Sequence, residues 1–247
     1  MSASMLIQRI DSLVVAVSLV AAIGPCSLAE AQFTSSLGGN FNNAGSALLG
    51  TMIANRLLVD AARKGAEPGP PARQPASASH VTFQPAAANH MVKELAGTLA
   101  PDPANRRQLE QAFEEYLQNF AQQASRDHEP ANDVGRAAAY FVMVNYFAAT
   151  GQEPTDDQAD GAQAIFRAGL ALSPGFTRMG NRDRQRLYES LVVLGSLPLA
   201  GVVDATQAKD AAREKMFRGF ARELLETLLG VPVEKIRLTK TGFSVGG

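Results

Sequence analysis

The stretch from Ala137 to Ala149 reads Ala-Ala-Ala-Tyr-Phe-Val-Met-Val-Asn-Tyr-Phe-Ala-Ala, and it decides the fold. Apart from Asn145 and the hydroxyl groups of Tyr140 and Tyr146, it is apolar on every side. A helix that is hydrophobic all round belongs in the middle of a bundle, where every face meets another element. The sequence therefore predicts a central helix in a helical protein.

The segments around this stretch predict further helices, because apolar residues recur at spacings of three and four between Pro and Gly breakers. Asp133 can cap the central helix and Gly151 can end it, while Thr155 and Gln158 form the pattern of a capping box. The other helices are expected over residues 86–100, 104–125, 155–172, from Asn181 or Asp183 to Gly195, and over 205–229.

The expected fold class is mainly α: a globular multi-helix bundle with short terminal strands. The strands are predicted at His80–Gln84 and within Val233–Phe243, where apolar and polar residues alternate. We expect these two segments to pair with each other and so to bring the ends of the domain together.

The first 31 residues have the layout of a secretory signal peptide. Arg9 precedes an apolar run, and the small residues around Ala31 predict cleavage between Ala31 and Gln32. The alternative is an N-terminal anchor that is retained. Cleavage would remove Cys26, the only cysteine, so that no disulfide could stabilise the exported chain.

Residues 32–64 are predicted to be a flexible leader followed by a tethered helix, Ala47–Ala62. The wide apolar arc of this helix would dock on the main domain, on a membrane or on another chain. Residues 65–79 form a Pro-rich linker, in which the missing amide donors forbid a helix. The helical domain is expected over residues 80–243.

The charge balance excludes one class of partner. The chain has 23 Lys and Arg against 24 Asp and Glu, whereas nucleic-acid binding favours an excess of basic residues. We therefore expect no nucleic acid among the partners.

The sequence contains few side chains of the kinds that carry out catalysis or bind metals. None of the three histidines has a partner at the i, i+4 spacing of a helical zinc site. The acidic run 156–161 resembles the start of a calcium loop, but the twelfth position of such a loop is Arg167 where a glutamate is needed. We expect no cofactor, no metal and no catalytic residue.

Two groups of residues are candidates for ligand binding. Arg182 and Arg186 share a helix face near a positive helix start and could hold an anion; the alternative is a solvated surface on which Asp183 and Glu189 are their local partners. Asn145, with Tyr140 and Tyr146 nearby, could line a ligand site; the alternative is a hydrogen bond across the bundle, since a buried amide must find a partner.

Three stretches in this order carry a resemblance: Asn-Asp-Val-Gly-Arg-Ala-Ala-Ala-Tyr-Phe from Asn132, Arg-Leu-Tyr-Glu-Ser-Leu-Val-Val-Leu-Gly from Arg186, and Leu-Leu-Gly-Val-Pro-Val-Glu-Lys-Ile-Arg-Leu-Thr from Leu228. Behind a signal peptide, they resemble an uncharacterised family of secreted bacterial all-helical proteins of unknown function. The resemblance covers about residues 86–243 and leaves out the leader and the linker. It implies export and a helical domain, but no activity.

The predicted function is that of an exported protein, periplasmic or secreted, of the bacterial envelope or exterior. We expect it to act by binding or assembly, with an unknown envelope protein or a second copy as its partner. One alternative is an envelope hydrolase that uses carboxylate or Ser chemistry. The other is a membrane-surface module that makes its contact through Ala47–Ala62.

Overall fold

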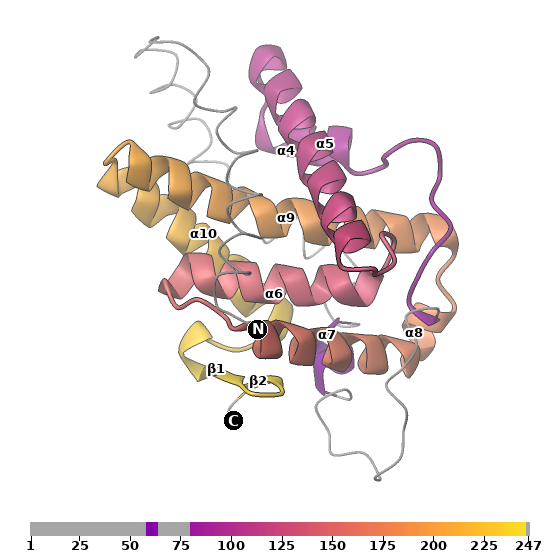
Figure 1. Cartoon of the computed structure of the whole chain (residues 1–247). Coiled ribbons are helices and arrows are strands. Elements are labelled where there is room, and N and C mark those ends of the chain that lie inside the picture. Colours follow the sequence, from indigo (N-terminus) through magenta and orange to yellow (C-terminus); the bar gives the residue numbers. More distant parts are fainter. Residues whose placement is uncertain (1–57, 64–79, 246–247) are drawn as a thin grey trace.

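The computed structural model describes residues 58–63 and 80–245 of the chain (Figure 1). These residues form a mainly α bundle with one short hairpin, which confirms the expected fold class. The predicted signal peptide with its cleavage point at Ala31–Gln32, the leader and the Pro-rich linker lie outside the described residues. The elements in chain order are α4 (Val92–Leu99), α5 (Pro103–Arg126), α6 (Val134–Thr150), α7 (Asp156–Ala171), α8 (Pro174–Thr177), α9 (Asn181–Gln207), α10 (Ala211–Leu229), the 3-10 turn η2 (Val233–Lys235), β1 (Ile236–Thr239) and β2 (Gly242–Val245).

The helix α6 lies at the centre of the bundle, as its apolar sequence predicts. It packs against α9, α10 and α7, and Figure 1 shows it between α9 and α7 with α10 beside it. Phe141 and Val142 of α6 are fully buried. Burial of such side chains away from water is the main force that holds these helices together.

The predicted signals at the ends of α6 and α7 are confirmed. The side chain of Asp133 accepts a hydrogen bond from the backbone N–H of Arg136 at 3.0 Å, which satisfies one of the free amides at the start of α6. Gly151 ends α6 in the left-handed conformation, with φ 74°. The capping box of Thr155 and Gln158 is present at the start of α7.

The prediction that Gly195 ends a helix is wrong, because α9 continues through Gly195 and Pro198 to Gln207, and the next helix begins only at Ala211. A Cβ at position 195 would lie 3.0 Å from the ring of Tyr140, so this glycine lets α6 and α9 approach closely. Pro198 has no N–H to give to the carbonyl of Leu194, one helical turn earlier. Asn145 of α6 fills that vacancy: its Nδ2 donates to the Leu194 carbonyl at 3.3 Å.

Among the described residues, α9 is the one helix long and apolar enough to span a membrane by length and composition alone. Its most apolar window is 89% buried inside the bundle, as expected for the core helix of a globular protein. This feature is therefore weak evidence for membrane insertion.

The helix predicted over residues 86–100 is shorter than expected, since α4 begins only at Val92. Side chains of α9 accept hydrogen bonds from the backbone N–H groups of residues that precede α4. A carboxylate oxygen of Glu189 accepts from the N–H groups of His90 and Met91, at 2.7 Å each, and Gln185 accepts from the N–H of Ala86 at 2.8 Å. These distant acceptors hold residues 86–91 in an irregular path, which no local pattern could indicate.

The predicted C-terminal strand exists, but the expected pairing is wrong. β1 pairs with β2 in an antiparallel hairpin in which Ile236 lies opposite Val245, while Thr82 makes only an isolated bridge to Asp133. Closing a tight turn costs far less chain entropy than joining segments more than 150 residues apart. Gly242 supplies the turn with a φ of 120°, and the hairpin lies against α7 (Figure 1).

Residues 58–63 form a helical segment that packs on α7. Leu58 and Ala61 are fully buried, and a Cβ added at Gly169 of α7 would collide with the backbone carbonyl of Ala61. The end of the predicted tethered helix thus lies against the domain. Residues 47–57 of that helix are outside the described residues.

Candidate functional site

A cleft of about 340 Å³ opens where the end of α5 meets α6 and the first half of α7. The floor comes from α6, one wall from α5, and the other wall from α7 and Pro154, which lies two residues before α7. The residues that line it are Phe120 and Gln123 of α5, Asp127 and Glu129 of the α5–α6 connection, Arg136, Ala139, Tyr140, Met143, Val144 and Phe147 of α6, Pro154 before α7, and Ala159, Asp160 and Gln163 of α7.

The floor of the cleft is an apolar strip along one face of α6. Its side chains lie three and four residues apart, so they share one side of the helix. The opposite side carries Phe141 and Asn145, which face the core. Phe120 of α5 packs on Tyr140 of the floor, with ring centroids 4.9 Å apart.

Tyr140 contributes its ring to the cleft, while its hydroxyl is held inside the bundle. The hydroxyl oxygen lies 2.9 Å from Oγ of Ser196 on α9. Burial raises the pKa of the Tyr140 phenol to about 12, and the hydrogen bond with Ser196 only partly offsets this rise. The phenol is therefore neutral at physiological pH and serves as a fixed part of the wall.

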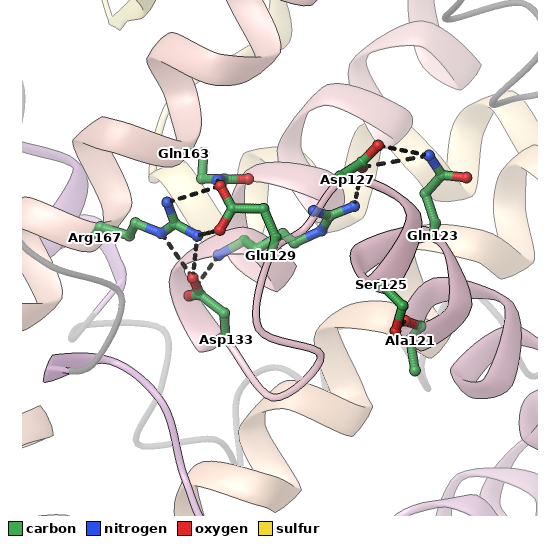
Figure 2. Close-up of polar contacts among 9 residues, drawn as sticks. Ala121, Gln123, Ser125, Asp127, Glu129, Asp133, Gln163 and Arg167 are labelled. Carbon is green, nitrogen blue, oxygen red and sulfur yellow. Dashed lines mark hydrogen bonds and ion pairs between the residues drawn. The ribbon is translucent and has the colours of Figure 1, made fainter.

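One end of the cleft is charged. Nη2 of Arg136 lies 2.7 Å from Oδ2 of Asp127, and Nε2 of Gln123 donates to the same carboxylate at 3.1 Å (Figure 2). The guanidinium of Arg136 also lies over the ring of Phe120, 5.5 Å from its centroid. The ion pair therefore ties the last turn of α5 to the first turn of α6.

A second arginine, Arg167 of α7, holds the loop between α5 and α6 (Figure 2). Its Nη2 lies 2.5 Å from Glu129 and 2.5 Å from Asp133. Asp133 is completely buried, and this burial raises the pKa of its carboxyl group, against the opposing effect of Arg167. Burial lowers the pKa of Arg167 in turn, but its bonds to Glu129 and Asp133 outweigh this effect, so the net shift is upward. Arg167 is thus a fixed cation that sets the position of this loop relative to α7.

The lining is mainly apolar, with carboxylates and one arginine at its edges. The lining contains no His, Cys or Ser, and Asp127 and Glu129 already accept hydrogen bonds from arginines. Within residues 58–63 and 80–245, no three His, Cys, Asp or Glu side chains gather as a metal site would need.

Of the predicted ligand residues, only Tyr140 lines the cleft. Asn145 is fully buried on the other side of α6, where its Nδ2 donates to the carbonyls of Phe141 and Leu194. The predicted hydrogen bond across the bundle is confirmed. The Tyr146 hydroxyl donates to Gln152 at 2.8 Å.

Arg182 and Arg186 lie on α9, and neither lines the cleft. Arg186 pairs with Glu94 of α4 at 2.9 Å, and Arg182 is exposed. The alternative that made Glu189 a local surface partner is wrong, because Glu189 is buried and accepts from the amides before α4.

The cleft residues that sequence reasoning missed come from three separate elements. Arg136 and Arg167 carried the best signal, since each is the only cation of its helix. A cation in such a position needs a partner, but the sequence does not say which carboxylate meets it. The pairing with Asp127 and Glu129 appears only once α5, α6 and α7 are assembled.

The fold and the cleft together define a helical bundle with an open groove on its surface. The chain belongs to a family of unknown function, DUF6683, whose model matches residues 8–246. No curated protein and no solved structure matches the chain. The match also includes the leader and the linker, which the resemblance noted in the sequence had placed outside the family.

Proposed function

We propose that this protein is an exported module of the bacterial envelope or exterior that binds a partner through the cleft between α5, α6 and α7. The observation that carries the proposal is the cleft itself: an apolar strip closed at one end by ion pairs. Its partner is an envelope protein or a second copy of the chain. The signal-peptide layout of residues 1–31 supports export.

The local chemistry supports binding over hydrolysis. A hydrolase would need a proton donor or an activated nucleophile at the reacting bond. Here the hydroxyl of Tyr140 bonds Ser196, and the carboxylates of Asp127 and Glu129 bond arginines. These groups hold the walls of the cleft in place.

The export part of the proposal is tested by mass spectrometry of the protein from each cell fraction. We expect a chain that begins at Gln32, in the periplasm or the medium. As a control, Ala31→Phe should slow cleavage, because the processing site requires small residues. Recovery of the uncleaved chain from the cytosol of wild-type cells would overturn this part.

The binding part is tested by photo-crosslinking in the cells that produce the protein. Phe147, a half-buried residue of the cleft floor, is replaced by benzoylphenylalanine, and the exposed Gln118 of α5 is replaced in the same way as a control. We expect a discrete crosslinked species from position 147 only. The cleft-filling variant Ala159→Trp should abolish it. A crosslink that survives Ala159→Trp, or none at position 147, would contradict binding in the cleft.

A further inference from the structure

The charges around the cleft indicate what kind of ligand it takes. Three carboxylates, Asp127, Glu129 and Asp160, belong to the lining, against one guanidinium, that of Arg136. Arg167, just behind the lining, is shared between Glu129 and the buried Asp133. Carboxylates therefore outnumber cations in this region, and a positive ligand is favoured over a negative one.

Both arginines are already engaged. Arg136 is bound to Asp127 and packed over Phe120, and its side chain is only 11% exposed. Arg167 is 15% exposed and bonded to two carboxylates. An anionic ligand would have to displace these pairs and leave a carboxylate without its partner, which is costly for buried charges. A cationic ligand can approach carboxylates from solvent while both arginine pairs stay in place, because Glu129 keeps 30% of its side chain exposed and Asp160 is exposed.

The shape of the cleft favours an elongated apolar ligand. The strip on α6 runs from Arg136 to Phe147, which corresponds to about 16 Å at the rise of an α-helix. Phe147, at the other end of this strip, carries no charge. About three turns of a helical peptide fit this length, with apolar side chains at i, i+3, i+4 and i+7 on the floor.

We propose that the cleft binds a short amphipathic peptide segment of a partner protein, with its apolar face on α6 and a basic residue at the Asp127–Glu129 end. This inference rests on the proposed binding function and names the chemistry of its ligand. The apolar strip supplies affinity, and the surplus carboxylates select the basic residue.

The test uses the full chain and three synthetic 12-residue helical peptides with identical apolar faces. They differ at one terminal position, which is Arg, Gln or Glu. We expect the Arg peptide to bind about tenfold more tightly than the Glu peptide, with the Gln peptide between them, and the difference to shrink as salt is raised. Equal or tighter binding of the Glu peptide would overturn the proposal.

Two protein variants on one helix locate the effect. Asp160→Lys reverses a charge of the cleft lining and should weaken the binding of the Arg peptide about fivefold. Asp157→Lys reverses an equally exposed charge one turn earlier, outside the lining, and should leave affinity within about twofold. Equal effects of the two variants would contradict a site in the cleft.

The peptide is also compared with a cationic amphiphile, dodecyltrimethylammonium below its micelle concentration. Tighter binding of the amphiphile than of the Arg peptide would overturn the peptide assignment. If no peptide binds while the crosslink from position 147 persists, the peptide inference fails and the binding function stands. If the crosslink is absent as well, the binding function itself fails.

Discussion

At the scale of single residues, Asn145 shows how one polar group replaces a backbone hydrogen bond that is missing from the neighbouring helix. Pro198 leaves the carbonyl of Leu194 without its helical donor, and Asn145 donates to it from α6. A buried carbonyl without a partner costs about 1 to 3 kcal/mol. Asn145 therefore belongs to the architecture of the core.

This arrangement predicts coupling between Asn145 and Pro198. Asn145→Ala should lower the free energy of unfolding by about 1 to 3 kcal/mol in the wild-type background. In a Pro198→Ala background the loss should be smaller, because the new N–H at position 198 bonds the Leu194 carbonyl instead. Urea denaturation of the four proteins in the double-mutant cycle measures the difference. Equal losses in both backgrounds would contradict the assignment.

Residue-scale signals also show where sequence reasoning worked. Asp133, Gly151 and Thr155 act on amides and carbonyls within four residues of themselves, so their roles could be predicted. The role of Glu189 could not, since its partners His90 and Met91 lie about a hundred positions earlier in the chain.

At the scale of elements, α7 meets the helical segment 58–63 with almost no space between the backbones. Gly169 makes this approach feasible, because a Cβ there would collide with the carbonyl of Ala61. The contact buries Leu58 and Ala61 completely.

Gly169→Ala should therefore detach residues 58–63 from α7 and lower the free energy of unfolding by about 1 to 3 kcal/mol. Gly219→Ala is the matched control: it is the same change in the interior of α10, with no neighbour within 4 Å of the new Cβ. It should stabilise the protein by up to about 1 kcal/mol through helix propensity.

Hydrogen exchange of residues 58–63 is the direct measurement for this pair of variants. We expect faster exchange in Gly169→Ala and unchanged exchange in Gly219→Ala. Equal protection of the segment in Gly169→Ala and in the wild type would show that the contact does not hold it.

Sequence reasoning at this scale erred at Gly195, which was interpreted by itself as a helix end. Gly195 and Pro198 are residue types that often end helices, yet α9 continues through both. Helix α6 packs closely against Gly195, and Asn145 of α6 donates to the carbonyl that Pro198 leaves without its helical donor. The cleft was missed for a related reason. Each of its walls is an ordinary amphipathic surface, and only the assembly of α5, α6 and α7 brings Phe120, Arg136 and Asp160 together.

At the scale of the whole molecule, burial of tyrosines couples stability to alkaline pH. Burial raises the pKa of Tyr140 to about 12 and raises the pKa of Tyr116 and Tyr188 as well. In the unfolded chain these phenols would ionise near pH 10. The folded protein keeps protons that the unfolded chain releases, so the free energy of unfolding must fall as pH rises above 10.

We expect a loss of about 1.4 kcal/mol per pH unit for each of these tyrosines in that range. The absorbance of tyrosinate at 295 nm, measured just after a jump to pH 11, checks the cause. The folded protein should show a smaller increase than the chain unfolded in urea at the same pH. A full increase while helicity persists in circular dichroism would contradict the burial of these phenols.

The placement of α6 has a further consequence for how such a protein can change over generations. The side that carries Phe141 and Asn145 maintains the core, whereas the side that carries Met143, Val144 and Phe147 opens to the cleft. Substitutions on the open side can alter the preference for the proposed ligand while the scaffold keeps its shape. Tyr140 joins the two sides through Ser196, so exchange of this residue would disturb recognition and architecture at once.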